Sequence, residues 1–568
     1  MTTPLAPTAL PNLAGHAFET MVEVLQSRAA TQSDRVAFIW LGTDAHPDTS
    51  ITYAELDTRA RAIGAVLHEC GPPGERALLL VPPGPEFVAA LFGCFYAGWI
   101  AVPAHPPPLN QRLERIRSLA SDAQPRAALT SLATLGRIEP RLADEPDLAR
   151  LQWLAIDAAP VPPDDWPTSD VTAQDLAVLQ YTSGSTAAPR GVMLTHANLV
   201  HNAAQIQRRF EADSAARGLI WLPPYHDMGL IGGILEGVWA GFPTALMAPV
   251  VFLQRPRRWL EAITRTQATI SGGPNFAYDL CVERIAPGER EGLDLSSWRV
   301  AFNGAEPVRA ATLRRFAEAF GPYGFQESAF YPCYGLAEAT LIVSGGAVSS
   351  PPVVVQLDAN SPHMVGCGQS IDDQALRIVH PVSLVPCAPR EVGEVWVAGP
   401  SVAAGYWRQP TLTEEVFAAR QADGSGPYLR TGDLGFLAET ELFITGRLKA
   451  VLILGGRKIH AEDIEASLAD DQVGKRPGSV VALAVDAGGQ ERLAVIQEAR
   501  SSADLELTAK SIRARVAAAH QLPVWTVVLT RPGGIPRTSS GKVQRAVCYD
   551  LFVRHQFDSV YEWQAPQP

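Results

Sequence analysis

The sequence has no cysteine pairs of the kind that bind metals or build a disulfide framework. Its seven cysteines stand singly, without a CxxC spacing, and their number is odd. Structural zinc sites and disulfide frameworks use closely spaced or even sets of cysteines. We therefore expect free thiols in a cytoplasmic protein, and neither a zinc site nor a cysteine nucleophile.

A membrane-spanning run is also missing. The most apolar stretch, residues 87–102, is 16 residues long and is followed by Pro103, whereas a spanning helix needs about 20 apolar residues. The N-terminus lacks the basic start and apolar run of a secretory signal. The apolar stretch therefore predicts a buried helix that leads into a strand, and we expect no membrane span.

Positive charge is scarce, and the formal net charge is -12. Because a nucleic-acid-binding protein needs a basic face, we expect no nucleic-acid partner. Hydrophobic residues make up 47% and charged residues 19% of the 568 residues, as in an ordinary globular chain. Chains longer than about 300 residues usually divide, so we expect several domains.

Apolar strand-like runs alternate with helical patterns. Residues 77–81 and 100–103 are typical of buried strands, and residues 86–98 between them predict a helix. Further along, residues 175–181 and 191–194 predict strands on either side of a polar loop. This alternation indicates α/β layers.

A helix is predicted directly after the second of these strands. Thr195 is a suitable N-cap residue. Leu199, Ala203, Ile206 and Phe210 follow at helical spacing and would form one buried face.

The pattern changes after about residue 345. Residues 394–397 and 442–444 resemble strands with nearby glycine turns, which indicates a β-rich subdomain over 346–446. The remaining residues suffice for a small separate domain. We therefore predict a large α/β domain over 1–446, with subdomains 1–175, 176–345 and 346–446, and a small mobile α+β domain over 447–568.

The polar loop has the composition of a phosphate site. Hydroxyl side chains surround one glycine and a cation follows, in the order Thr182, Ser183, Gly184, Ser185, Thr186 and Arg190. Hydroxyls and loop amides can bind phosphate oxygens, and a guanidinium can offset their charge. Such loops are also common as plain surface turns, but the flanking strands and helix favour phosphate binding. The Walker pattern GxxxxGK[ST] is absent.

The run YTSGSTAAPRGV followed by THANL resembles the phosphate loop of the adenylate-forming superfamily, which includes acyl-CoA synthetases and peptide-synthetase adenylation domains. Most members have glycine at the position of Ala187 and lysine at that of Arg190. Arginine there is typical of a narrower branch, the fatty acyl-AMP ligases. Arginine keeps the positive charge, so phosphate binding should persist.

Two further runs, WLPPYHDMGLIG from Trp221 and SGGPNFAYDL from Ser271, are similar to segments that flank the acyl pocket in that branch. The resemblance implies that His226 acts near the substrate carboxylate. The acyl-pocket residues that it implies are Tyr225, His226, Met228, Gly229, Pro274, Asn275 and Phe276.

The runs NGAEP from Asn303 and YGLAEAT from Tyr334 resemble the family's adenine site. By this resemblance Tyr334 stacks on the base, and Glu338 binds Mg²⁺ with help from Thr182. The nucleotide residues implied by these two runs are Asn303, Gly304, Ala305, Glu306, Tyr334 and Gly335.

Three later motifs complete the family order. Asp433, in YLRTGDLG, matches the acid that binds the ribose hydroxyls, and a carboxylate can accept two hydrogen bonds. Arg447 would contact ribose or phosphate, and Lys449 would be the pivot of a hinge at 447–450. Lys542, in the final lysine loop, would stabilise the charge that develops between carboxylate and α-phosphate.

The resemblance implies that ATP and Mg²⁺ convert a fatty acid to acyl-AMP with release of pyrophosphate. His226, Arg190 and Lys542 would be the catalytic residues. The acyl group would then pass to the phosphopantetheine thiol of an acyl carrier protein supplied in trans.

Two other interpretations stay open. Only 25 residues separate Thr340 from Gly366, where the branch usually carries an insertion, and the run at 454–459 looks closer to ligases that use CoA. CoA is therefore the alternative acceptor. A non-catalytic nucleotide- or acyl-binding scaffold is the third interpretation, and it is disfavoured because every expected charged position is filled.

Overall fold

The structure is a computed structural model that describes residues 18–42, 47–106, 113–142, 144–159, 170–182, 189–356, 363–448, 451–454, 457–469, 479–487, 491–499, 504–520, 522–537 and 543–565. These residues form two compact units, which we describe separately. The first extends to Phe443, apart from Gly432–Gly435, and these four residues belong with the chain from Ile444 onward to the second.

A six-stranded sheet forms the first layer of the first unit. Its strands, in spatial order, are β6 (Gln152–Ala155), β5 (Ala127–Thr130), β3 (Arg76–Leu79), β4 (Ile100–Pro103), β7 (Leu176–Thr182) and β8 (Arg190–Thr195). The neighbours from β6 to β7 pair in parallel, and β7 and β8 form an antiparallel hairpin. Strands β3, β4 and β5 consist mainly of apolar residues, and nearly all of these are buried. This is expected for a parallel sheet, in which both faces are covered.

A nine-stranded sheet is the largest within the described ranges. Its spatial order is β17 (Gln369–Ser370), β14 (Ile342–Gly345), β13 (Phe330–Gly335), β12 (Val300–Asn303), β11 (Ile270–Gly272), β9 (Gly218–Ile220), β10 (Thr244–Leu246), β1 (Val36–Trp40) and β2 (Thr49–Thr52). The strands from β13 to β1 run in parallel, and β2, β14 and β17 pair antiparallel to their neighbours.

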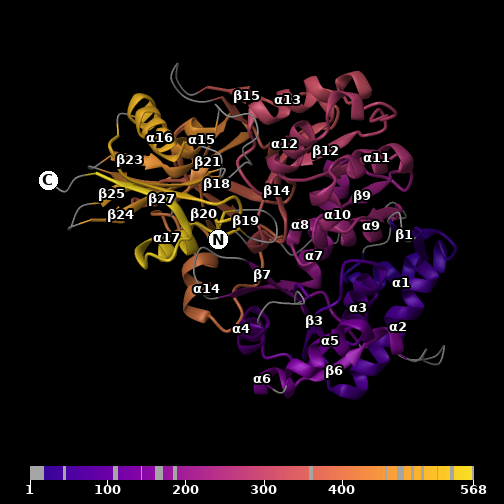
Figure 1. The fold of residues 1–568 in the computed structure, drawn as a ribbon. Coiled ribbons are helices and arrows are strands. Elements are labelled where there is room, and N and C mark those ends of the chain that lie inside the picture. Colours follow the sequence, from indigo (N-terminus) through magenta and orange to yellow (C-terminus); the bar gives the residue numbers. More distant parts are fainter. Residues whose placement is uncertain are drawn as a thin grey trace. The chain divides into compact units, whose positions relative to one another are not determined.

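Helices connect these strands. The longer ones are α1 (Met21–Thr31), α2 (Tyr53–Cys70), α3 (Pro85–Tyr96), α4 (Glu114–Ala123), α5 (Leu132–Leu142), α7 (His196–Arg209), α11 (Arg257–Thr266), α12 (Asn275–Arg284), α13 (Ala310–Phe320) and α14 (Pro410–Phe417). The short ones are α6 (Pro146–Ala149), α8 (Asp227–Gly229), α9 (Glu236–Ala240), α10 (Pro249–Gln254), η1 (Ile156–Ala158), η3 (Pro287–Glu289), η4 (Gly321–Tyr323), η5 (Glu327–Ala329) and η6 (Ala337–Ala339). Figure 1 shows α11 and α12 alongside strands β9 and β12.

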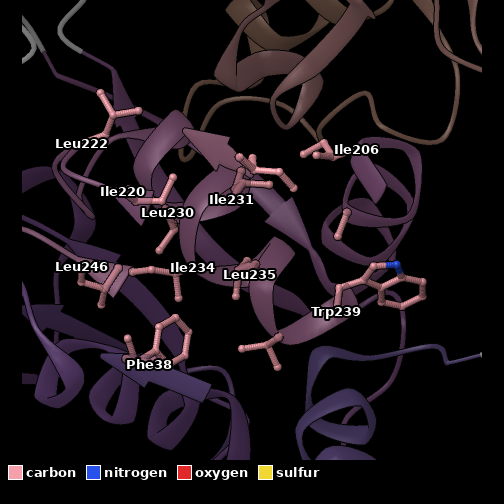
Figure 2. Packing of buried hydrophobic residues seen from close by; sticks show 14 of the residues in the cluster. Phe38, Ile206, Ile220, Leu222, Leu230, Ile231, Ile234, Leu235, Trp239 and Leu246 are labelled. Atoms are coloured by element: carbon pink, nitrogen blue, oxygen red, sulfur yellow. The ribbon is translucent and has the colours of Figure 1, made fainter. Parts of the chain in front are cut away.

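A π-helix, η2 (Leu230–Leu235), lies between α8 and α9. Its side chains belong to the main core, together with Phe38 from β1 and Leu246 from β10. Figure 2 shows these residues gathered around η2, with Ile206 of α7 and Trp239 of α9 nearby. The wider turn has one residue more than an α-helical turn, a feature that is frequent at functional sites.

A β-rich part follows β14, and its residues up to Phe443, other than Gly432–Gly435, belong to the first unit. It includes the pair β15 (Val354–Val355) and β16 (Met364–Val365), and a sheet in the order β18 (Ala375–Val379), β19 (Gly393–Ala398), β20 (Leu429–Ala438) and β21 (Glu441–Arg447).

The second unit is a small α+β unit with its own core of aliphatic side chains. Its strands are the pair β22 (Val451–Leu454) and β23 (Arg457–His460), and a sheet in the order β24 (Val480–Asp486), β25 (Glu491–Glu498), β26 (Val524–Thr530) and β27 (Ser559–Gln564). Its helices are α15 (Ala461–Ala469), α16 (Leu505–His520) and α17 (Arg545–Val553).

The α/β character predicted from the sequence is confirmed. From Phe87 to Tyr96 every residue of α3 is buried, and the helix leads into β4 as expected. Thr195 is the N-cap of α7, and the predicted helix face from Leu199 to Phe210 is buried. None of the helices in the described part of the chain is long and apolar enough to span a bilayer.

Candidate active site

Four candidate segments of the first unit lie at one edge of the nine-stranded sheet. Strands β9, β11, β12 and β13 are neighbours and run in parallel, so their carboxyl ends share an edge. The segments that begin at Trp221, Gly273 and Asn303 directly follow or end the first three strands, and Tyr334 lies near the end of β13. Ligands of open α/β sheets bind at this edge. The sequence motifs, scattered along the chain, are thus brought together by strand order.

His226 stands at the turn between the first segment and α8. It is the N-cap residue of α8, and its carbonyl oxygen accepts a hydrogen bond from Leu230 N at 2.7 Å. The preceding carbonyl, of Tyr225, accepts a bond from Gln180 Nε2 on β7 at 2.9 Å. Gly229 packs so closely that a Cβ there would overlap the Pro223 carbonyl oxygen. The backbone that carries His226 is therefore firmly held.

Aromatic side chains cluster beside this turn. Trp221 packs on Phe252 of α10, with ring centroids 4.1 Å apart, and on Phe276 of α12, at 5.9 Å. Phe276 is partly buried, and Met228 also packs against the core. Among the described residues the buried indole nitrogen of Trp221 has no hydrogen-bond partner. The cluster is an apolar surface suited to a hydrocarbon chain.

Asn275 fastens the loop that follows β12. Its side-chain oxygen accepts bonds from Asn303 Nδ2 at 3.3 Å and Arg309 N at 3.0 Å, and its Nδ2 donates to Pro307 O at 2.9 Å. Asn275 is fully buried and is the first residue of α12, whose N-cap is Pro274. Its observed contacts are thus with the predicted adenine loop, while its role in an acyl pocket stays a prediction.

The adenine loop itself has a tight backbone. A Cβ on Gly304 would lie 2.9 Å from the Cys333 carbonyl oxygen, and Ala305 has a positive φ of 69°. Burial raises the pKa of the Cys333 thiol to about 12, so the thiol stays protonated at neutral pH. The side chain of Glu306 is half-buried and lies 4.0 Å from Arg309. Gly304, Ala305 and the protonated Cys333 thiol carry no charge. The charged groups described at this loop are those of the Glu306–Arg309 pair.

Tyr334 and Gly335 end β13 before the turn η6. Tyr334 is buried. A Cβ on Gly335 would overlap the Leu341 carbonyl oxygen, so glycine is required for this close approach. Thr340 ends the turn with a φ of 67°, and its hydroxyl donates to Ser401 O at 2.6 Å. The turn that carries Glu338 is therefore strained and tightly anchored, as functional turns often are.

Glu338, Arg190 and Tyr406 form a cluster. The Tyr406 hydroxyl donates to Glu338 Oε1 at 2.8 Å, and the Arg190 guanidinium lies over the Tyr406 ring, 5.7 Å from its centroid. Burial, and then the negative charge of Glu338, raise the pKa of Tyr406, whereas Arg190 acts to lower it. The phenol thus stays protonated and contacts both charges.

Two predicted nucleotide residues contact each other in the second unit. Arg447 Nε donates to Asp433 Oδ1 at 2.7 Å, with Asp433 buried and Arg447 mostly exposed. The arginine therefore holds one carboxylate oxygen of the residue expected to bind ribose.

Several predicted residues fall outside the described part of the structure. Thr182 ends β7 with its backbone opposite Arg190, but its side chain is not described. The other predicted residues outside the described set are Ser183, Gly184, Ser185, Thr186, Lys449 and Lys542. Their roles stay predictions, as does the domain boundary at 447.

Sequence reasoning missed Tyr406 and the polar side of α7. Asn202 of α7 donates to Ser401 Oγ at 2.9 Å, and His201 Nδ1 lies 2.7 Å from the same hydroxyl. Asn198 donates to the carbonyls of Pro400 and Val402. The available signal was the helical spacing of these amide and imidazole side chains, which places them on one side of α7. In the structure they contact the segment around Ser401. For Tyr406 the sequence offers no comparable signal.

Comparisons with known proteins match the chain to one enzyme family. The profile of the AMP-binding enzyme family matches residues 25–407. The medium-chain-fatty-acid–acyl-carrier-protein ligase JamA of Moorena producens is 41% identical over 96% of this chain and 97% of its own length. The long-chain-fatty-acid–AMP ligase FadD26 of Mycobacterium tuberculosis is 36% identical over 93% of this chain and 96% of its own. A fatty acyl-adenylate ligase from Legionella pneumophila, solved with acyl adenylate and pyrophosphate, superposes with a TM-score of 0.75 at 38% identity, covering 96% of this chain and 98% of that one.

These matches show that the chain belongs to the AMP-binding enzyme family of adenylating ligases. Within that family, the branch predicted from Arg190 and the two acyl-flanking runs, the fatty acyl-AMP ligases, is confirmed by the relatives and by the solved structure. The predicted multidomain α/β fold is confirmed by the same superposition.

Proposed function

We propose that the protein activates a fatty acid with ATP to give acyl-AMP and pyrophosphate, and then transfers the acyl group to the phosphopantetheine thiol of an acyl carrier protein. The observation that carries this proposal is the convergence of four motif segments at the carboxyl edge of β9, β11, β12 and β13. The acceptor is inferred from JamA, whose name specifies an acyl-carrier-protein ligase.

The adenine loop has the right chemistry for the base. Asn303 is fully buried, and its side-chain oxygen has no hydrogen-bond partner among the described residues. An acceptor buried without a partner is costly, and the amino group of adenine would satisfy it. Gly304 and Ala305 offer a thin wall, and Tyr334 offers a ring for stacking.

The phosphates require positive charge and a metal ion. Arg190 starts β8 beside the hydroxyl-rich loop, where its guanidinium can bind phosphate oxygens. Among the described residues no three acidic, histidine or cysteine side chains gather to hold a metal ion. Glu338 alone nevertheless fits Mg²⁺, which is commonly bound through one or two carboxylates plus substrate phosphates. When bound, Mg²⁺ neutralises charge on the phosphates.

The reaction then needs no nucleophile from the protein, because the substrate carboxylate attacks the α-phosphorus. The chain has to align the two reactants and stabilise the developing negative charge. We assign the stabilisation of the developing charge to Lys542 and Arg190. His226 would guide the approach of the substrate carboxylate. Asp433, together with Arg447, would bind the ribose hydroxyls. The acyl chain would lie on the aromatic cluster of Trp221, Phe252 and Phe276. Rotation about Lys449 would withdraw Lys542 before the thiol enters.

The test uses purified full-length protein, ATP, Mg²⁺ and saturated fatty acids of medium and long chain. Acyl-AMP and pyrophosphate are measured first, and CoA or phosphopantetheinylated carrier protein is then added in parallel. We expect acyl-AMP with at least one acid and transfer to the carrier protein. Failure to form acyl-AMP with every acid would refute the activity, and acyl-CoA formation as fast as adenylation would make CoA the acceptor.

Lys542→Ala separates an enzyme from a binding scaffold. Loss of the lysine should abolish adenylation while ATP binding, measured by calorimetry, stays close to that of the unaltered protein. A scaffold would show ATP binding without adenylation in both proteins.

A further inference from the structure

The segment that carries Tyr406 is built into the framework that also carries Arg190. Met193 N donates to Gly405 O at 2.9 Å and Ala404 N donates to Met193 O at 3.0 Å, so the backbone of the segment is hydrogen-bonded to β8. Tyr406 itself forms a bridge with Val192, two residues after Arg190. The position of the tyrosine relative to the arginine is therefore fixed by the backbone.

The same segment is bonded to the turn that carries Glu338. Ala403 N donates to the backbone oxygen of Glu338 at 2.9 Å. The Tyr406 ring packs edge-on against Phe417 of α14, with centroids 5.1 Å apart, and Tyr406 N donates to Thr413 Oγ1 at 2.9 Å. The phenol has little freedom to move away from either charge.

We propose that Tyr406 is a positioning residue that separates Arg190 from Glu338. The guanidinium lies over the ring and also interacts with the hydroxyl, which donates to the carboxylate, so Tyr406 lies between the two opposite charges and contacts both. This inference rests on the proposed function, because it concerns the groups that would meet Mg-ATP.

The physical reason is competition between a direct Arg190–Glu338 ion pair and the interactions that each residue would form with Mg-ATP. A cation and an anion that contact the same buried phenol would attract each other strongly if the phenol were absent. A direct Arg190–Glu338 pair would reduce the charge that each can offer to a ligand. With the ring between them, Arg190 stays available for phosphate oxygens and Glu338 for Mg²⁺.

The test measures ATP binding by calorimetry in EDTA, which removes the metal and leaves Arg190 as the group of interest. Tyr406→Leu should weaken metal-free ATP binding by about five- to tenfold, the range of a cation–π or partly buried charge interaction. Adding Glu338→Gln to this variant should restore the affinity to within about twofold of the unaltered protein, because the competing carboxylate is gone. Tyr323→Leu, at a tyrosine on the turn η4, serves as the matched control and should leave ATP affinity unchanged.

Tyr406→Phe tests the hydroxyl separately. The ring remains, so metal-free ATP affinity should stay within about twofold. Glu338 loses its hydrogen-bond donor, so the Mg²⁺ concentration for half-maximal acyl-AMP formation should rise severalfold. Phenylalanine is the smallest change available and keeps the test usable if the leucine variant does not fold.

Two results would overturn the inference. The first is a Tyr406→Leu/Glu338→Gln variant that binds metal-free ATP as weakly as Tyr406→Leu alone, because the defect would then be general packing. The second is a Tyr406→Phe variant with an unchanged Mg²⁺ requirement. Failure of the proposed function looks different, since the unaltered protein would itself form no acyl-AMP.

Discussion

Glu236 provides a sharp test of how burial acts in this fold. It opens α9 directly after the π-helix, it is 1% exposed, and neither carboxylate oxygen has a hydrogen-bond partner among the described residues. Burial raises the pKa of this carboxyl well above its usual range, because a charge without a partner is strongly disfavoured in the interior. The folded protein should therefore hold Glu236 in its neutral form at pH values where the unfolded chain ionises it.

The sign of the resulting pH dependence follows from the raised pKa. Below the unfolded pKa of about 4.3 both states are protonated, and the contribution of the group is fully present. As the pH rises, only the unfolded state loses its proton, which favours unfolding by up to about 1.4 kcal/mol per pH unit until the folded pKa is reached. Glu236→Gln removes this titration while keeping nearly the same shape. The variant should match the unaltered protein below about pH 4 and become progressively more stable above it.

Thermal unfolding followed by tryptophan fluorescence is a suitable assay. Two pH units correspond to at most about 3 kcal/mol, and an unfolding entropy of about 2.1 cal/mol/K per residue makes this about 3 °C for a unit of about 400 residues. We therefore expect the difference in Tm between Glu236→Gln and the unaltered protein to grow by up to about 3 °C from pH 5.5 to pH 7.5. Glu415→Gln, at an exposed position of α14, is the matched control and should show no growing difference. A difference for Glu236→Gln that is the same at both pH values would refute the reasoning.

Three further substitutions have clear expected outcomes. Gly335→Ala should slow acyl-AMP formation and lower Tm, because its Cβ would overlap the Leu341 carbonyl oxygen; an unchanged rate of pyrophosphate release would contradict this. Arg430→Met should lower the free energy of unfolding in urea by about 3 kcal/mol, because Glu394 is 2% exposed and would lose the guanidinium 2.7 Å away; a loss below about 1 kcal/mol would show that the pair matters little. Asp433→Asn should weaken AMP binding about tenfold in calorimetry, because the amide loses the charge that strengthens bonds to ribose hydroxyls; equal affinity would remove Asp433 from the ribose site.

Local patterns in the sequence were enough to predict the hairpin and helix around the phosphate loop. The strands on both sides of the loop, the N-cap at Thr195 and the buried face of α7 all depend on residues close in sequence. Their hydrogen bonds and side-chain spacing repeat with the period of the element itself. For this reason the strand after the loop could be predicted from residue 191, one residue after its observed start at Arg190, before any tertiary contact was known.

The π-helix and the Tyr406 contacts could not be derived in this way. Leu230–Leu235 has the composition of any buried helix, and the widened turn depends on packing against β1, β9 and β10. Tyr406 pairs with Val192 across a large separation in sequence, and pairing of that kind leaves no periodic signal. The motif resemblance named Arg190 and Glu338 individually, but the side chain that joins them is visible only once the chain is folded.

Side chains of α7 help to hold the strained backbone at Thr340 in place. Thr340, with its positive φ, is held by the bond from its hydroxyl to Ser401 O, and Ser401 in turn accepts from Asn202. Burial lowers the pKa of His201, which also contacts Ser401, so the imidazole is neutral at neutral pH and places no additional charge near Glu338. A polar helix face buried in this manner costs stability unless its groups are satisfied. We infer that α7 keeps this face because it fixes the turn of Glu338 and the segment of Tyr406 in one rigid arrangement, which preorganises both before ATP binds.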